Sequence, residues 1–524
     1  MPGDASHDSA LRRRVLRGAL SNYAGQFITL ATGFLLTPFV IHRLGVTTYG
    51  LWVLVGSVVA YGKLFDFGIW GAIIKYVAEY RARGETGQAR SLVATALTLH
   101  TLLGLIAIAL SAVIAPIFPD LFNVPPADRA TAMKLVLLAG LGIGISIPCT
   151  TSAAVLHGLH RFDLGNVISA VGTLLTGVAT VIVLLLGGGV LSMVAVSAPI
   201  TLLMQVPSVW MVNRIAPELK FGWRGARRAL VRKVVSFGSP LFVRQVAGRL
   251  ETKTDEIVIG AFLPVSAIAP YAVARRLSEW ASLLTQQFVK VLLPLASELD
   301  AHTDWVRLRA VYLTGTRLTL AIFLLLGCTL TILARPILTA WVGSAFAESA
   351  PLVAILTLAG LVDASQWPAG TILEGVARHR TLAAMSACSA LANLALSIAL
   401  VNGLGVTGVA LGTLIPTTAV CLGLIMPYAM RVIGIRIGEV LRTSVLPALL
   451  PVGPMVFTLF VLQQVVDLSS MLSLIAVAGV GTLVYVAGYL AVGASESERR
   501  TYRGFAFDAV RFATTFLKRL RAAT

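Results

Sequence analysis

The residues best suited to chemistry in this sequence are ten ionisable side chains within one otherwise apolar stretch, residues 236–296. They are Arg244, Arg249, Lys253, Arg275, Arg276, Lys290, Glu251, Asp255, Glu256 and Glu279. A charged side chain at membrane depth costs about 3 kcal/mol or more unless it is paired or faces a water-filled cavity. Six cations and four anions leave a net charge of +2. The stretch therefore indicates a cavity for a polar cargo, and its basic excess indicates an anionic one.

Polar residues in the first part of this stretch recur at helical spacing. Gln245, Arg249, Glu256 and Gly260 occupy positions i, i+4, i+11 and i+15, and Lys253 lies beside them. Such a stripe predicts that one face of a helix looks into a cavity. Arginine suits phosphate because its planar fork donates two hydrogen bonds at once.

We therefore predict a cationic substrate-binding cavity. Its candidate residues are Arg249, Lys253, Arg275, Arg276, Lys290 and Lys63. The alternative is a set of buried ion pairs, Arg275–Glu279 and Lys253–Glu256, that only fixes how the helices pack.

Polar residues in other apolar segments are candidates for lining the same cavity. Asn22, Gln26 and Thr29 share one face of residues 18–41, and Gln286 lies in the charged stretch. Interhelical hydrogen bonding is the rival interpretation of such side chains.

Three aspartates, Asp66, Asp255 and Asp363, are candidates for ion coupling. A carboxylate at membrane depth is a functional candidate because its burial is costly. Asp66 and Lys63 could instead neutralise one another, and Asp363, four residues before Trp367, could pair with Arg317. His100 is expected to be a packing residue with its hydrogen bonds satisfied.

The composition places the chain among polytopic membrane proteins. Its mean hydropathy is +0.85, and only 13% of its 524 residues are charged, against about 25% in soluble domains. The net charge of +18 does not indicate nucleic-acid binding, because the basic residues follow the membrane topology. No cysteine spacing fits a metal site or a disulfide framework, no G-x-x-x-x-G-K-[ST] loop occurs, and we expect no cofactor and no enzymatic activity.

Twelve stretches are long and apolar enough to span a membrane. They are residues 18–41, 50–74, 91–118, 131–156, 165–186, 188–212, 310–334, 351–375, 381–401, 404–429, 445–466 and 470–493. The charged stretch adds 236–262 and 264–296, joined by a turn at Leu263–Pro264. The first span follows a basic start but has no small-residue cleavage site after it, so we read it as retained rather than as a signal peptide.

The basic residues predict the orientation of these spans. With both termini on one side, that side carries 30 Lys and Arg residues in its loops and tails, and the opposite side carries 4. Lys and Arg concentrate on the cytoplasmic side. We therefore expect both termini in the cytoplasm and the protein in a bacterial plasma membrane.

The chain repeats itself weakly. Leu138–Leu141 recurs as Leu358–Leu361, and the loop at Glu79 recurs at Glu298. On this register the charged pair of spans falls where the first two spans fall in the first half. The expected fold is all-α with about 14 transmembrane helices, in two parallel six-helix repeats plus two C-terminal helices. Parallel repeats of this kind enclose a site near the midplane.

The expected domain boundaries follow from this repeat. They are a cytoplasmic basic tail (1–17), an N-lobe (18–212), a basic linker (213–235), a C-lobe (236–429), two further spans (445–493) and a basic amphipathic tail (494–524). Phe505, Phe512, Phe516 and Leu520 recur at helical spacing among basic residues in the last segment. This pattern predicts an interfacial helix on anionic membrane lipids, with a disordered tail as the alternative.

Several short motifs, in order over both halves, resemble the Wzx-type polysaccharide flippases of the multidrug/oligosaccharidyl-lipid/polysaccharide exporter superfamily. They are Asn22, Thr37-Pro38, Leu44-Gly45, Tyr49-Gly50, Asp66-Phe67-Gly68, Ile74-Lys75-Tyr76, Asp255, Val258-Ile259-Gly260, Tyr271, Leu293-Pro294 and Ser297-Glu298. The resemblance covers most of residues 15–430. It implies two six-helix lobes with alternating access and a polyisoprenyl-diphosphate-linked oligosaccharide as the cargo.

The resemblance also implies H+ or Na+ as a coupling ion and cooperation with polysaccharide polymerase or export machinery. The rival function is a cation-coupled multidrug exporter of the same superfamily, which prefers an acidic, aromatic cavity. A membrane-bound polymerase or transferase is the third possible function, and the short external loops argue against it.

Overall fold

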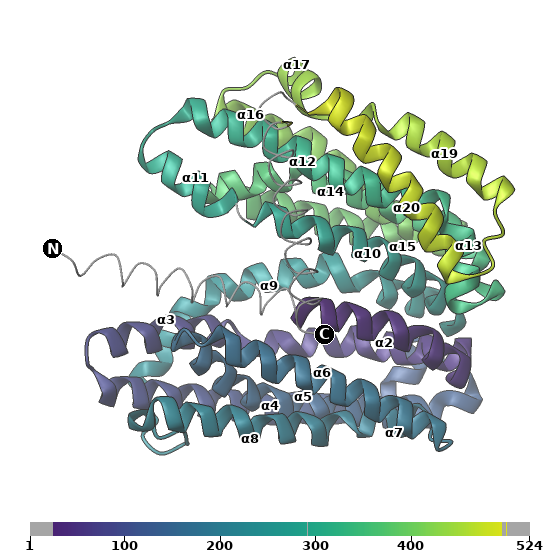
Figure 1. Cartoon of the computed structure of the whole chain (residues 1–524). Coiled ribbons are helices and arrows are strands. Elements are labelled where there is room, and N and C mark those ends of the chain that lie inside the picture. Colours follow the sequence, from purple (N-terminus) through teal and green to yellow (C-terminus); the bar gives the residue numbers. More distant parts are fainter. Residues whose placement is uncertain (1–24, 291, 495–498, 500–524) are drawn as a thin grey trace, which may run out of the picture. The chain divides into compact units, whose positions relative to one another are not determined.

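The computed structural model describes residues 25–290, 292–494 and 499 (Figure 1). Every regular element in these residues is helical, with no β-strand among them. The chain divides into two compact units. Unit 1 comprises Met1–Val273 and Ser386–Pro416, and unit 2 comprises Ala274–Met385 and Thr417–Thr524. The expected all-α membrane fold is confirmed.

The helices of unit 1 follow one another with short connections. They are the helix Gly25–Leu44, α2 (Val46–Tyr61), η1 (Gly62–Asp66), α3 (Ile69–Ala82), α4 (Thr86–Leu121), η2 (Pro126–Asp128), α5 (Arg129–Gly158), α6 (Phe162–Leu185), α7 (Val190–Ala195), α8 (Ser197–Ile215), η3 (Pro217–Leu219), α9 (Arg228–Phe262), η4 (Val265–Ala267), the start of α10 (Ile268–Val289) and part of α15 (His379–Val420).

Unit 2 holds the rest of α10 and α15 and the remaining helices. These are α11 (Leu292–Ala301), α12 (Trp305–Ile332), α13 (Ala334–Val342), η5 (Ser344–Ser349), α14 (Ala350–Gly375), η6 (Cys421–Ile425), α16 (Met426–Ile433), α17 (Ile437–Val440), η7 (Leu441–Val445), α18 (Leu446–Leu449), α19 (Val452–Val465), α20 (Met471–Gly488) and η8 (Tyr489–Gly493). The expected lobes, 18–212 and 236–429, describe sequence repeats and stay a prediction, since the compact units are divided within α10 and α15.

Eleven helical segments of the described chain are long and apolar enough to cross a membrane. One of them, His379–Ile433, is interrupted at Gly405, whose φ of 58° is not helical, as the separate spans 381–401 and 404–429 require. The helices α9 and α10 are too charged for that criterion but have spanning length. The 35 residues of α9 reach about 50 Å at about 1.5 Å per residue, more than the roughly 30 Å of a hydrocarbon core.

One expected boundary in the charged stretch is wrong. The span 264–296 is not one helix, because α10 ends at Val289 and α11 begins at Leu292. Pro294 lies in the first turn of α11, where proline is tolerated. The basic linker 213–235 stays a prediction, and α9 begins within it at Arg228.

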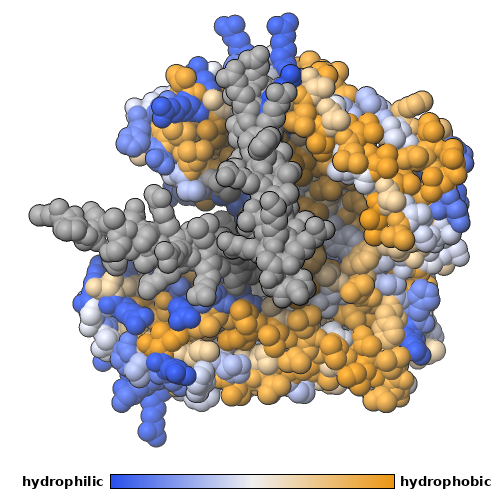
Figure 2. Space-filling model, viewed as in Figure 1, coloured by the Kyte–Doolittle hydropathy of each residue, from blue (hydrophilic) through white to orange (hydrophobic). Residues whose placement is uncertain are grey.

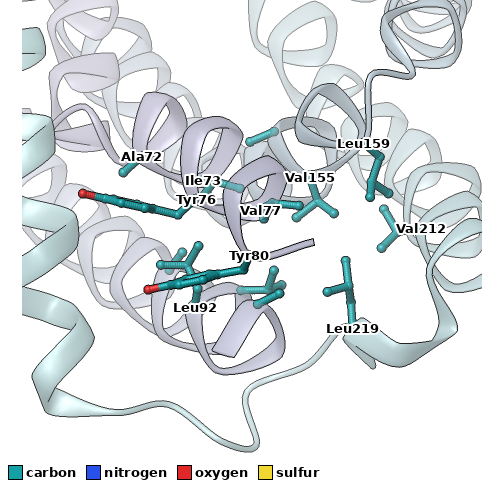
Figure 3. Packing of buried hydrophobic residues seen from close by; sticks show 14 of the residues in the cluster. Ala72, Ile73, Tyr76, Val77, Tyr80, Leu92, Val155, Leu159, Val212 and Leu219 are labelled. Carbon is teal, nitrogen blue, oxygen red and sulfur yellow. The ribbon is translucent and has the colours of Figure 1, made fainter. Parts of the chain in front are cut away.

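The core of unit 1 is a cluster of buried apolar side chains (Figure 3). Its labelled members come from α3, α4, α5, α8, η3 and the residue after α5, and they are Ala72, Ile73, Tyr76, Val77, Tyr80, Leu92, Val155, Val212, Leu219 and Leu159. Since α3 is anchored there, the broken segment η1 just before it is held in place.

The crossing of α4 and α5 in unit 1 depends on small residues. A Cβ added to Gly104 would overlap the backbone of Gly144, and one added to Gly144 would overlap the backbone of Gly104. Small residues let transmembrane helices approach closely, which is how helices pack in lipid.

The outer surface of unit 1 is apolar where lipid would contact it. Figure 2 shows a mainly orange surface over α6, with blue side chains gathered toward the helix ends. The exposed apolar residues of α6 are Phe162, Val167, Val171, Leu174, Leu175, Val178, Ile182 and Leu185. Their exposure is what a spanning helix requires.

Candidate functional site

The helix α9 carries the central cations of the predicted cavity in unit 1. Arg249 and Lys253 are both half-buried. The hydroxyl of Tyr61, at the end of α2, donates to the Arg249 carbonyl at 3.3 Å and lies 2.8 Å from the Thr254 hydroxyl. Neither cation forms an ion pair or side-chain hydrogen bond with the side chains that the structure describes, which do not include those of Arg244 and Glu251. The alternative Lys253–Glu256 pair is therefore not formed.

A second site in unit 1 surrounds Asp255, whose exposed fraction is 1%. Tyr271 donates its hydroxyl proton to Asp255 Oδ2 at 2.5 Å, and Thr413 donates to the same oxygen at 3.1 Å. Asn393 Nδ2 donates in turn to Thr413 Oγ1 at 3.0 Å. Asp255 is a buried carboxylate held by two hydroxyl donors, and it stays a candidate for ion coupling. The sequence singled out this carboxylate but not its hydroxyl partners.

A third site in unit 1 pairs Asp66 with His100. His100 Nε2 lies 3.0 Å from Asp66 Oδ1, and its Nδ1 lies 2.7 Å from Thr151 Oγ1. Asp66 also accepts the backbone N–H of Trp70. His100 is satisfied, as expected of a packing residue, but the sequence did not connect it with Asp66. The other expected pairing, Asp66 with Lys63, lies outside the described side chains.

The cations of unit 2 are engaged differently. Arg275 Nε lies 3.0 Å from Glu279 Oε1, which is the ion pair named above as the alternative to substrate binding. Arg276 and Gln286 are half-buried. Lys290 is exposed and donates to Gln287 Oε1 at 3.2 Å. Arg275 is therefore the residue for which the two interpretations, cargo binding and an ion pair with Glu279, compete most directly.

Asp363 in α14 of unit 2 does not form its alternative pair among the described residues. Trp367 Nε1 donates to Asp363 Oδ2 at 2.9 Å, whereas the Arg317 guanidinium donates to the Thr443 carbonyl at 3.4 Å. An indole donor neutralises less charge than a guanidinium would, so Asp363 remains a candidate for ion coupling.

The other predicted residues lie at or beyond the limits of the described chain. Gln26 is half-buried in the helix Gly25–Leu44. Asn22, the side chain of Lys63 and the amphipathic tail at 505–520 lie outside the described residues.

Comparison with known proteins identifies the family of this chain. A model of the family described as "Polysaccharide biosynthesis protein" matches residues 41–351, more than half of the chain. The chain belongs to this family. A curated relative, "Uncharacterized membrane protein EpsK" of Bacillus subtilis (strain 168), is 22% identical over 326 residues. The match spans 61% of this chain and 64% of that relative, which is less than two thirds of its length.

Solved structures share the fold of this family member. The "Lipid II flippase MurJ, inward closed conformation" has a TM-score of 0.72 at 15% identity, covering 90% of this chain and 98% of that one. An inward-facing "multidrug resistance MATE family transporter of the MOP superfamily" has a TM-score of 0.67 at 14% identity, covering 81% and 99%. The resemblance to exporters of this superfamily is thus confirmed for family and fold, and the chain is a multi-pass membrane protein.

Proposed function

We propose that this protein is a flippase that moves a polyisoprenyl-diphosphate-linked oligosaccharide from the cytoplasmic to the outer leaflet of the plasma membrane, for cell-surface polysaccharide synthesis. The observation that carries the proposal is the combination of a polysaccharide-biosynthesis family match with the fold of a lipid II flippase over 90% of the chain. The multi-pass fold is consistent with transport across a membrane, and the family description indicates polysaccharide as the final product.

The chemistry of α9 supports an anionic headgroup as the cargo. Arg249 and Lys253 lie half-buried in a helix of spanning length without a counter-ion among the described side chains. A diphosphate would supply the missing negative charge and accept the paired donors of an arginine. In this proposal the lipid tail stays in the bilayer while the lobes alternate in opening to each side, with both termini cytoplasmic and H+ or Na+ as the driving ion.

A cation-coupled multidrug exporter is the second candidate, because a MATE transporter shares the fold with a TM-score of 0.67. Organic cations would be repelled by the basic excess of residues 236–296. This charge favours the flippase over the exporter.

Lipid mass spectrometry of cells depleted of the protein tests the proposal. We expect a polyisoprenyl-diphosphate oligosaccharide to accumulate while surface polysaccharide is lost. An unchanged lipid-linked pool with altered drug sensitivity would favour the exporter, and a pool of incomplete oligosaccharides would favour an assembly enzyme.

Substitution of Arg249 connects that phenotype with the predicted cavity. We expect Arg249→Ala to abolish complementation at a normal protein level. Arg129→Ala is the matched control, because Arg129 is exposed and pairs with Asp120 at 2.8 Å. Full complementation by Arg249→Ala would exclude Arg249 from cargo binding.

A further inference from the structure

The histidine–carboxylate pair of unit 1 can exist in two protonation states without losing a hydrogen bond. His100 and Thr151 both have exposed fractions of 0%. In the neutral ring, Nε2–H donates to Asp66 and Nδ1 accepts from the Thr151 hydroxyl. In the imidazolium, Nδ1–H donates to the same hydroxyl oxygen, because a threonine hydroxyl can both donate and accept. A proton can therefore be taken up here without creating an unsatisfied buried group.

The pair is also connected with the surface of unit 1. The ring of His100 is sealed, but the Asp66 side chain is 17% exposed. Protons would reach the imidazole past the carboxylate. A histidine that serves packing alone does not require a partner whose side chain is partly exposed.

The carboxylate stands at a break in the backbone. Phe67 and Gly68 have positive φ values, 48° and 74°, and separate η1 from α3. Asp66 accepts the Trp70 N–H in the first turn of α3. A Cβ on Gly68 would overlap the backbone of Gly238 in α9, so the break touches the helix that carries Arg249. A change of charge at Asp66 therefore acts on the start of α3 and on its contact with α9.

The second repeat of the sequence lacks this pair. The register that aligns Glu79 with Glu298 aligns Asp66 with Thr285 and His100 with Thr319. Both threonines are buried and donate to carbonyls of their own helices, at 2.8 and 2.7 Å. The register of Leu138–Leu141 with Leu358–Leu361 is one residue longer and aligns the same positions with Gln286 and Leu320. On neither register does the second repeat place a histidine with a carboxylate at these positions.

The titratable groups nearest in sequence or on the neighbouring helix faces have other surroundings, and no described contact joins Arg90 of α4 or Lys134 of α5 to the pair. Lys75 of α3 lies over the rings of Tyr76 and Phe237, and Lys233 of α9 donates to the Tyr80 hydroxyl. On α5, His157 packs against the rings of Trp70 and Phe162, and the Cys149 thiol is half-buried. Among the described residues, Asp66 is the titratable group that contacts His100.

We propose that Asp66 and His100 form a proton-binding site in the first repeat, and that one proton taken up from water on one side of the membrane is released from it to the other in each transport cycle. Uptake converts the neutral imidazole with its carboxylate into an imidazolium–carboxylate pair, and release reverses this. The coupling rests on the proposed flippase function, whereas proton binding does not.

Proton binding is tested without cargo on the full-length protein in nanodiscs, with 13C-labelled histidines followed by NMR. His100→Gln identifies the resonance. We expect its chemical shift to change with pH, as proton uptake at the imidazole requires. Asp66→Asn removes the carboxylate that contacts the ring and should change the midpoint of that pH response. Absence of a His100 titration, or an unmoved midpoint in Asp66→Asn, overturns the site.

Coupling is tested in proteoliposomes that contain a fluorescent polyisoprenyl-diphosphate oligosaccharide. A gradient of one pH unit can bias a one-proton cycle by up to about tenfold, and we expect this response to vanish in His100→Gln and Asp66→Asn. His157→Gln, the matched control on α5, should keep it. Flipping by the wild type without a pH-gradient response overturns the coupling and leaves the flippase standing. Absence of flipping removes the proposed function, and the NMR titration then decides the site by itself.

Discussion

Replacing Arg275 and Glu279 singly and together separates cargo binding from helix packing in unit 2. The two side chains form an i,i+4 ion pair at 3.0 Å in which Arg275 is 13% and Glu279 46% exposed. If Arg275 only holds Glu279, either single substitution should have the same consequence. If Arg275 binds an anionic cargo, the two substitutions should differ.

The loss of the ion pair and the loss of diphosphate binding should differ clearly in magnitude. A half-exposed i,i+4 pair contributes about 0.3–0.5 kcal/mol to stability, so Glu279→Gln should lower the free energy of unfolding by less than about 1 kcal/mol. A hydrogen bond to a charged group contributes about 1.5–3 kcal/mol. Arg275→Gln should therefore weaken diphosphate binding by about 10- to 150-fold, at about 1.4 kcal/mol per tenfold change. Glu279→Gln removes a competing acceptor and should leave the affinity unchanged or raise it.

The assay is equilibrium binding of a polyisoprenyl-diphosphate oligosaccharide to purified protein, with thermal unfolding measured in parallel. Arg335→Gln is the matched control, because Arg335 also pairs with a glutamate, Glu348, at 2.9 Å but is well exposed. Wild-type affinity in the Arg275→Gln/Glu279→Gln double variant would refute the cargo-binding role of Arg275.

Three further predictions concern unit 1. Arg249→Lys keeps the charge but loses the bidentate fork, so surface polysaccharide should fall between the wild-type and Arg249→Ala levels; restoration to the wild-type level would contradict bidentate binding. Gly104→Leu should lower the free energy of unfolding by about 1–3 kcal/mol through overpacking. Gly142→Leu, whose added Cβ meets nothing within 4 Å, should have little effect, and equal unfolding temperatures for the two variants would refute the close crossing. Tyr271→Phe removes a buried donor from Asp255 and should lower the free energy of unfolding by about 2 kcal/mol; an effect below about 0.5 kcal/mol would show that this hydrogen bond adds little.

Local sequence determined the class of the protein and most of its spans. Hydropathy over about 20 residues identifies a spanning segment because each helix must satisfy its own backbone in lipid. The break at Gly405 could also be anticipated, because the sequence glycine–leucine–glycine separates two apolar runs. The i,i+4 pair Arg275–Glu279 could be anticipated because both residues share one helix face.

Only the tertiary structure decided which polar groups meet. His100 contacts Asp66 from another helix, and Asp255 receives its donor Thr413 from a helix 158 residues along the chain. A hydropathy pattern reports how apolar a segment is but not which way it is rotated against its neighbours. Interhelical hydrogen bonds depend on that rotation, and it is set by packing such as the approach of Gly104 to Gly144.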